Sequence, residues 1–439
     1  MHLPDSMKIG EDGMLHIGDI SAEDLTAKFS TPLLVLAENE IRKNAADYNH
    51  SLTKYYPGKS RVLYASKAFS CRSIYKIIED VGLGTEVVSG GELYTALKSG
   101  FPPDKIYFHG NNKTPAEINM ALENDIGGFF VDNFQEADML QDAAQKKNKK
   151  INVIIRIKPG VKAQTHEYMI TGDNISKFGV GIEDGKAFRL IKKIFENNNL
   201  ELKGLHGHIG SQIYEEKAYV KHAQILFSFM AEIKNTTGRE LSVLNLGGGL
   251  GVAQTKEDRD VSISHFVKIL SETVLKEAEK HDLALPELML EPGRSLLNSS
   301  GITLYTVGTI KKSPQAPTYV AVDGGMTDNI RPALYGARYS CFLAGRNEGS
   351  RDKIDAKIAG KCCESGDILI ENAEIREPEP GDILAIPATG AYTYSLASNY
   401  NSIPKPAVVL VKNGEAYKII ERETYDDLLA RDKIPPHLT

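Results

Sequence analysis

The stretch Val62-Leu63-Tyr64-Ala65-Ser66-Lys67 is a short apolar run that ends in a lysine. Further runs of this kind follow it up to Glu291, each separated from the next by a longer segment with helical spacing. They are Glu86–Val88, Ile106–Phe108, Gly128–Val131, Val153–Ile157, Leu202–His206, Val243–Leu246 and Leu288–Glu291. Strand-like runs that alternate with helices are typical of a parallel sheet, and eight of them over about 230 residues predict a closed (β/α)8 TIM barrel.

Helix signals lie between these runs. Ser70–Val81 has apolar side chains at helical spacing, and Thr114-Pro115-Ala116-Glu117 has the pattern of an N-cap, a first-turn proline and a capping-box glutamate. We therefore expect helices to begin near Ser70 and after Thr114.

After Gly301 the sequence pattern changes to strand-like runs with turn residues between them. The candidate strands are Ile302–Val307, Tyr319–Val322, Asp355–Ile358, Ile368–Glu371, Ile383–Ile386 and Ala407–Val411. Asn413-Gly414 predicts a type I′ hairpin turn, because both residues tolerate positive φ angles. The N-terminal runs Met14–Ile17 and Leu33–Leu36, with a short helix at Ser21–Lys28, are expected to complete this domain. We predict a barrel at 37–300 and an all-β barrel or sandwich made of 1–36 and 301–439.

Composition excludes several function classes. The 439 residues carry a net charge of −6, which gives no electrostatic footprint for nucleic acid or for an anionic membrane. No apolar run approaches the roughly 18 residues of a membrane-spanning helix, and Met1–Gly13 lacks the apolar middle of a secretion signal. The four cysteines form no Cys-x-x-Cys pair or disulfide framework, so we expect a cytoplasmic protein.

Ionisable residues and glycines gather where the predicted strands end. The groups are Lys67, Glu86 to Ser89, His109, Asp132, Arg156, His208 with Ser211, Gly247 to Gly249, and Glu291 to Arg294. Chemistry in such barrels lies at the C-terminal ends of the strands. A lysine that closes a strand is usually solvated, but Lys67 lies between apolar residues, which favours a desolvated amine suited to forming a Schiff base.

Two glycine-containing loops predict a phosphate site. Gly247, Gly248 and Gly249 follow the seventh run, and Gly293 and Arg294 follow the eighth, the corner where barrels of this kind bind phosphate. Gly-Gly-Gly alone is as often a flexible turn, and the second loop makes the phosphate interpretation the better one. Glu291 would hold the pyridine nitrogen of pyridoxal 5′-phosphate (PLP) protonated, which turns the ring into an electron sink.

His208 follows the sixth run in Leu205-His206-Gly207-His208-Ile209-Gly210-Ser211. A single histidine is commonly a satisfied core residue. We favour stacking of His208 on a planar cofactor ring, with Ser211 as a hydrogen-bonding partner. The His-x-His spacing is also compatible with a zinc site, but the sequence shows no third ligand nearby, so we predict no metal.

The motifs together resemble a known family. They are Tyr64 to Ala68, Val87 to Leu93, His109 to Lys113, His208 to Gln212, Asn245 to Gly249, Glu291 to Arg294, Cys363 to Asp367 and Gly390 to Tyr392. They resemble, nearly end to end and in the same order, the PLP-dependent decarboxylases of the alanine-racemase-like fold, most closely the diaminopimelate decarboxylases. The resemblance implies decarboxylation of meso-2,6-diaminopimelate to L-lysine and CO2, the last step of lysine biosynthesis.

The resemblance also implies roles for individual residues. Lys67 would bind the PLP aldehyde, and Cys363 would protonate the carbanion left by CO2. The cofactor-binding set would be Lys67, His208, Ser211, Gly247, Gly248, Gly249, Glu291, Gly293, Arg294 and Tyr392. The substrate-binding set would be Arg294, Arg331 and Tyr335 for the distal carboxylate, Glu364 for the distal ammonium, and Tyr392. The implied assembly is a homodimer in which the β domain of one subunit contributes Cys363 and Glu364 to the active site of the other.

Three departures leave the substrate open. Arg338 and Tyr339 stand where the family commonly has an aromatic residue and a histidine, and Glu86 stands where aspartate is usual. The alternatives are a related decarboxylase for ornithine, arginine or a carrier-bound acidic amino acid, and a non-catalytic relative that binds PLP or a partner protein. A binding-only protein has no need of Cys363 as a proton donor. The sequence also leaves open whether Val161–Ser176 closes over the substrate.

Overall fold

The computed structural model describes residues 3–160, 176–259, 261–345 and 351–438. The chain forms two compact units, one made of 1–41, 253–258 and 297–439, the other of 42–252 and 259–296. We call them the β unit and the barrel unit. The domain division at residues 37 and 300 stays a proposal. The segment 161–175, which holds nearly all of the candidate lid, lies outside the described residues.

Eight parallel strands close the barrel in the order β5-β6-β7-β8-β9-β11-β12-β13, and β13 pairs back with β5. The strands are β5 Ser60–Ala65, β6 Gly84–Val87, β7 Ile106–Phe108, β8 Gly128–Val131, β9 Ile151–Lys158, β11 Leu200–Gly207, β12 Val243–Asn245 and β13 Glu287–Leu290. The short β10 Val180–Gly181 adds to β9 outside the closed ring. Each predicted run coincides with one of the eight strands, so the predicted TIM barrel is confirmed.

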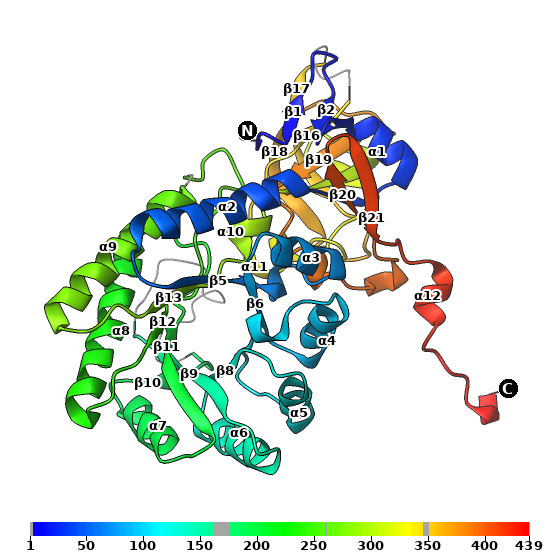
Figure 1. Ribbon diagram of the computed structural model, residues 1–439. Helices are drawn as coiled ribbons and strands as arrows, with labels where there is room; N and C mark the ends of the chain where they lie inside the picture. The colour runs from blue at the N-terminus through cyan, green and yellow to red at the C-terminus, as the bar shows by residue number, and fades with distance from the viewer. Residues whose placement is uncertain (1–2, 161–175, 260, 346–350, 439) are drawn as a thin grey trace. The chain divides into compact units, whose positions relative to one another are not determined.

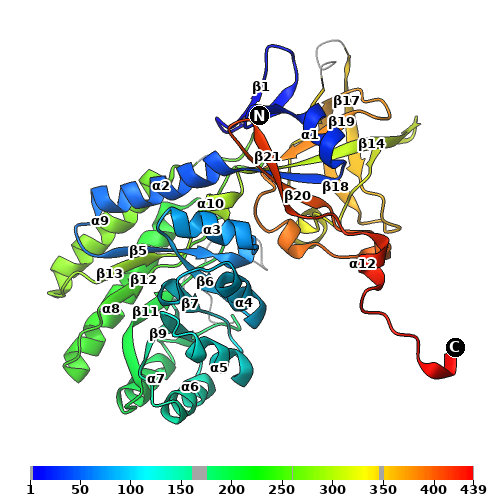
Figure 2. The same cartoon turned by 45° about the vertical axis from the view of Figure 1, so that its right-hand side comes forward.

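Helices follow the strands and lie around the outside of the barrel (Figure 1). They are α3 Arg72–Asp80, α4 Gly90–Lys98, α5 Pro115–Glu123, α6 Phe134–Lys146, α7 Lys186–Phe195, α8 Glu216–Thr237, α9 Ile263–His281 and α10 Arg294–Leu297. The turned view shows α4 to α7 outside their strands, and α8 beside α9 (Figure 2). The predicted capping box is present at α5, where the Thr114 N–H donates to Glu117 Oε2 over 2.8 Å and the Glu117 N–H donates to Thr114 Oγ1 over 3.3 Å.

The barrel interior is packed with side chains from six of its strands. Leu63, Tyr107, Phe130, Ile154, Val243 and Met289 form one buried cluster. Burial of each such side chain contributes roughly 1.5–3 kcal/mol. Because this filling leaves no pore, chemistry in the barrel belongs to its ends.

The β unit contains a sheet with the order β18-β17-β15-β14-β4-β20-β21, and β19 pairs with both β14 and β16. Its strands are β4 Leu33–Ala37, β14 Gly301–Ser313, β15 Ala316–Val322, β16 Phe342–Leu343, β17 Lys353–Ala359, β18 Ile368–Arg376, β19 Ile383–Pro387, β20 Ala407–Lys412 and β21 Glu415–Ile420. A separate small sheet consists of β1 Met7–Ile9, β2 Leu15–Ile17 and β3 Ile20–Ser21. The helices are α1 Ala22–Phe29, α11 Arg331–Tyr335 and α12 Tyr425–Leu429, and α2 Glu38–Tyr55 follows β4 along the chain.

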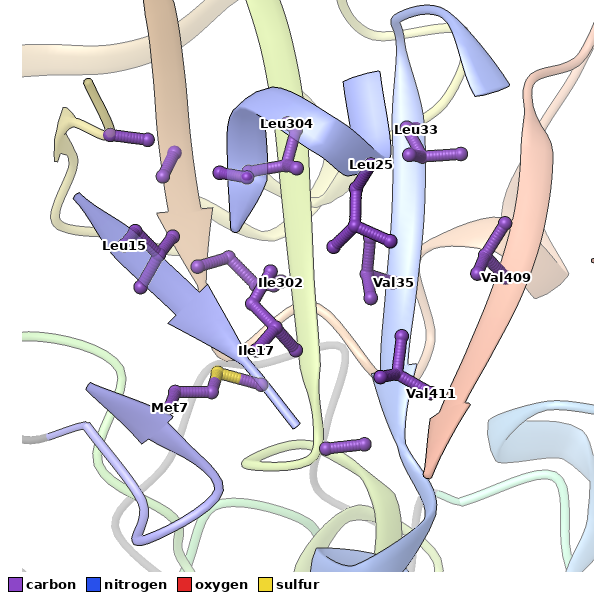
Figure 3. Close-up of a cluster of buried hydrophobic side chains, with 14 of the residues drawn as sticks. Met7, Leu15, Ile17, Leu25, Leu33, Val35, Ile302, Leu304, Val409 and Val411 are labelled. Carbon is purple, nitrogen blue, oxygen red and sulfur yellow. The ribbon is translucent and has the colours of Figure 1, made fainter. Parts of the chain in front are cut away.

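The N-terminal segment completes the sheet from within, as expected. Strand β4 pairs antiparallel with β14 and parallel with β20, so residues from the two ends of the chain share one core. Figure 3 shows Val35 of β4 between Ile302 of β14 and Val409 of β20. The hairpin at Asn413-Gly414 joins β20 to β21, and both turn residues have positive φ angles, 48° and 78°. Within the described ranges, no helix is both long and apolar enough to cross a membrane.

Candidate active site

Lys67 and Glu86 face each other at the C-terminal ends of adjacent strands. Lys67 lies in one turn of 3₁₀ helix, Ser66–Ala68, directly after β5, and Glu86 is the third residue of β6. The Nζ atom of Lys67 is 3.4 Å from Oε1 of Glu86. The lysine side chain is 44% exposed, whereas the glutamate is buried. Burial raises the pKa of Glu86, although Lys67 opposes that shift.

Glu291 follows β13 and accepts hydrogen bonds from residues at the ends of β7, β11 and β12. Asn245 Nδ2 donates to Oε1 over 2.7 Å, His109 Nε2 is 2.8 Å from the same oxygen, and His206 Nε2 is 3.1 Å from Oε2. Burial alone would raise the pKa of Glu291, but the two histidines overcome it and hold that pKa well below its usual range. Burial also lowers the pKa of His109 to about 4, so at neutral pH a neutral imidazole donates to an ionised carboxylate.

The imidazole of His208 is neutral as well. Its pKa is lowered well below the usual range by burial and by the nearby charges of Lys67 and Arg156. The Gly248 N–H donates to its Nδ1 atom over 3.4 Å. An uncharged ring at this position is suited to stacking on another planar ring.

The loop after β12 requires glycine at successive positions. A Cβ atom on Gly248 would lie 2.1 Å from the Glu291 carbonyl oxygen, and one on Gly249 would lie 2.1 Å from the Gly210 carbonyl oxygen. Gly249 also has a φ angle of +103°, which L side chains rarely adopt. The loop is therefore a bare backbone cradle at the barrel end, as a phosphate site requires.

Arg294 lies close to Ser211, which follows β11. It begins α10 after Gly293, and its guanidinium donates to Ser211 Oγ over 3.2 Å. The barrel unit thus brings together Lys67, His208, Ser211, Gly247, Gly248, Gly249, Glu291, Gly293 and Arg294 at the C-terminal ends of its strands. An amine, an ionised carboxylate, a neutral imidazole and a glycine cradle fit the aldehyde, pyridine nitrogen, ring face and phosphate of PLP.

His206 and His208, whose spacing suggested a zinc site, do not group together as ligands in the described part of the chain. His206 instead groups with His109 and Glu291, and the ligand atoms of these three lie within 4.8 Å of one another. These atoms hydrogen-bond among themselves and to Asn245, so they satisfy one another as a hydrogen-bonded group. We interpret this group as support for the Glu291 carboxylate.

Arg331 and Tyr335 lie on the short helix α11 of the β unit. Arg331 is buried, and its guanidinium lies 5.5 Å from the centre of the Tyr335 ring. Arg338, one of the departures from the family pattern, is exposed and lies 3.2 Å from Glu257.

The remaining predicted residues also belong to the β unit. Cys363 and Glu364 are exposed in the loop between β17 and β18, and the Cys363 N–H donates to Asn401 Oδ1 over 2.8 Å. Asp367 closes this loop by accepting hydrogen bonds from the N–H groups of Met326 and Cys362 over 2.6 and 2.8 Å. Tyr392 is half-buried with a φ angle of 60°. The roles of these residues stay predictions.

Sequence reasoning gave no role to several residues that build the barrel site. Glu86 and His109 stand among the strand-end groups, and His206 and Asn245 lie within motifs, yet none was assigned a function. The signal available was their position at the end of a strand. Only the closed barrel brings all four together near Glu291.

Comparisons with known proteins agree with this site. Residues 38–298 match the family described as pyridoxal-dependent decarboxylase, pyridoxal binding domain. A diaminopimelate decarboxylase of Bacillus subtilis is 44% identical over 98% of this chain and 98% of its own length. The crystal structure of M. jannaschii diaminopimelate decarboxylase in complex with L-lysine has a TM-score of 0.93 at 37% identity and covers 99% of both chains. The Helicobacter pylori enzyme complexed with L-lysine has a TM-score of 0.85 at 31% identity and covers 93% of this chain and 98% of its own.

Two of these findings decide the family. The family match covers more than half of the chain, and the Bacillus subtilis relative aligns over nearly the whole of both sequences. The resemblance inferred from the motifs is confirmed. The chain belongs to the diaminopimelate decarboxylase family of pyridoxal-dependent decarboxylases.

Proposed function

We propose that this protein uses PLP to decarboxylate meso-2,6-diaminopimelate to L-lysine and CO2, the last step of lysine biosynthesis. The observation that carries the proposal is Glu291, an ionised carboxylate held by three donors at the same barrel end as Lys67. PLP, when bound, supplies an electron sink for the electron pair left on the α-carbon as CO2 departs.

The residues of the barrel unit would serve this chemistry in separate ways. Lys67 would hold PLP at its aldehyde carbon through the side-chain amine. Glu291 keeps a proton on the ring nitrogen, because a carboxylate whose pKa is held low leaves the proton on its partner. His208 covers one ring face, and the glycine loop with Arg294 holds the phosphate.

The residues of the β unit would bind the substrate and finish the reaction. Arg331 and Tyr335 suit the distal carboxylate, because a guanidinium offers fork-like donors. Glu364 suits the distal ammonium, and Tyr392 touches both cofactor and substrate. Cys363 delivers a proton to the α-carbon. The relatives from M. jannaschii and Helicobacter pylori were solved with L-lysine, which supports this choice of product.

We further infer a homodimer in the cytoplasm, with Cys363 and Glu364 acting in the partner's active site. The family resemblance supports the shared site. The cysteines support a reducing compartment, because all four are free thiols.

The experiment that tests the proposal measures CO2 release from meso-diaminopimelate, lysine, ornithine and arginine. We expect release from meso-diaminopimelate with L-lysine as product; activity on ornithine or arginine alone would contradict the substrate. Lys67→Ala should remove the visible absorbance of bound PLP and lower turnover by about 10³-fold or more. Lys59→Ala, which changes an exposed lysine before β5, is the matched control and should retain both.

A further inference from the structure

Glu86 and His109 have no part in the function proposed above, yet both lie within its cofactor site. Oε1 of Glu86 is 3.4 Å from the Lys67 Nζ atom, and Oε2 of Glu86 is 3.1 Å from His109 Nε2. The same Nε2 atom is 2.8 Å from Glu291 Oε1. A continuous line of polar contacts therefore joins the lysine to the carboxylate assigned to the pyridine nitrogen.

His109 has a single Nε2 position for two carboxyl groups. Its own pKa of about 4 makes it neutral at pH 7, so it offers one N–H there. Glu86 Oε2 lies 3.1 Å from this nitrogen and Glu291 Oε1 lies 2.8 Å from it. The two carboxyl groups are therefore close to each other. Two carboxylates that close in a buried site do not both ionise readily, and one of them keeps a proton.

The donors around the two carboxyl groups decide which one that is. Glu291 also accepts from Asn245 and His206, so it is the stable anion. Glu86 has fewer donors: its Oε1 makes no hydrogen bond of good geometry within the described part of the chain, and the Lys67 amine lies 3.4 Å from it. Burial favours its neutral form. The titratable and charged groups that act on Glu86 are Lys67 after β5, His109 after β7, Arg156 on β9 and Glu291 after β13.

We infer that Glu86 exchanges a proton with the Lys67 amine, and that His109 is a positioning residue that holds Glu86 for this task while it donates to Glu291. The inference rests on the proposed use of PLP. When Lys67 binds the aldehyde, a C–N bond forms and the aldehyde oxygen leaves as water. Two protons must reach that oxygen. Glu86 in its protonated form gives one of them, and the Lys67 NH2 group gives the other and retains one N–H.

The contacts of the Glu86 side chain support this role. Its two carboxyl oxygens contact Lys67 and His109 at the same time. The buried pair of Lys113 and Glu136, 2.6 Å apart at another strand end of the same barrel, offers a matched comparison. Lys113 also donates to the carbonyl oxygens of Gly110 and Phe130, as a structural ion pair does.

The test follows covalent attachment of PLP to Lys67 rather than turnover. The full-length protein is depleted of PLP, PLP is added back across a range of pH, and the rise of the visible absorbance is timed. We expect Glu86→Gln to slow attachment by about 10- to 100-fold and to flatten its pH dependence, as loss of a general acid–base does. Glu86→Asp, which keeps a titrating carboxyl group, should recover part of the rate. Glu136→Gln should stay within about twofold of the wild-type rate, because its carboxyl group serves Lys113.

His109 is tested by the position of the pH profile. His109→Leu removes the imidazole that lowers the pKa of Glu86, so the midpoint of the attachment rate should move to higher pH by about one unit, and His109→Gln, which keeps a polar side chain beside that carboxyl group, should move it back. If Glu86→Gln attaches PLP within twofold of the wild-type rate and with an unchanged pH profile, the inference is overturned. If the midpoint of the pH profile does not move in His109→Leu, the positioning role of His109 is overturned. Absence of the visible band in the wild-type protein would instead overturn the use of PLP itself.

Discussion

The guanidinium of Arg331 donates a hydrogen bond from Nε to the hydroxyl group of Tyr339 over 2.9 Å, and both side chains are buried. Tyr339 is one of the residues that depart from the family pattern. Its hydroxyl fixes the orientation of the arginine proposed to bind the distal carboxylate of the substrate. The departure therefore acts on a substrate-binding residue through its support.

Tyr339→Phe should weaken substrate binding more than it slows the chemical step. Loss of a buried hydrogen bond to a charged group costs about 1.5–3 kcal/mol, so we expect KM for meso-diaminopimelate to rise about tenfold or more while kcat changes little. Steady-state kinetics measures both. Arg338→Ala, which alters the exposed neighbour paired with Glu257, is the control and should leave KM within twofold. Equal KM values in Tyr339→Phe and wild type would contradict the role of Arg331.

Cys363→Ala should lower kcat by about 100-fold, because a positioned proton donor contributes 10²–10⁴-fold. Decarboxylation in deuterated water, with the stereochemistry of label in the lysine product, should show loss of facial selectivity. Cys362→Ala is the matched control. The Cys362 thiol is half-buried, and burial raises its pKa to about 11. An unchanged rate and stereochemistry in Cys363→Ala would remove the thiol from the mechanism.

Gly249→Ala should lower the affinity for PLP by more than about tenfold, because the new Cβ would displace the backbone of the phosphate cradle. Fluorescence titration of the PLP-depleted protein measures the affinity. Gly238→Ala separates this clash from backbone strain, since Gly238 has a φ angle of +70° but no neighbouring atom within 4 Å of its Cβ position. That control should lose about 1–2 kcal/mol of stability and keep its PLP affinity.

Asp328→Asn should flatten the pH dependence of stability between about pH 4 and pH 7. Burial raises the pKa of Asp328 to about 7, while an unfolded aspartate titrates near 3.9. The native state thus binds more protons in this window. The stabilisation from this group is complete below the unfolded pKa and is lost as pH rises through the folded one.

Urea unfolding of wild type and Asp328→Asn at pH 5 and pH 8 measures this effect. The fall in the free energy of unfolding between the two pH values should be smaller in the variant by roughly 1–4 kcal/mol. Asp426→Asn, at an exposed position in α12, should behave as wild type. Equal pH slopes for all three proteins would show that Asp328 is not protonated in the native state.

The sequence by itself determined the barrel, because the period of its apolar residues changes between strand and helix at each of the eight runs. It also determined the hairpin at Asn413-Gly414, whose positive φ angles few other residue pairs adopt. Strand-end position placed Lys67 and Glu291 among the candidate groups, because parallel strands in a barrel end on the same face.

Only the tertiary structure decided how the site residues divide their charges. His109, His206 and Asn245 come from strands far apart in the sequence, and their donation to Glu291 depends on ring closure between β13 and β5. The hydrogen bond between Arg331 and Tyr339 in the β unit is likewise set by tertiary packing, because no pattern along the chain relates these two residues. Hydrogen bonds act over about 3 Å, and no sequence pattern specifies distances on that scale between side chains from different strands.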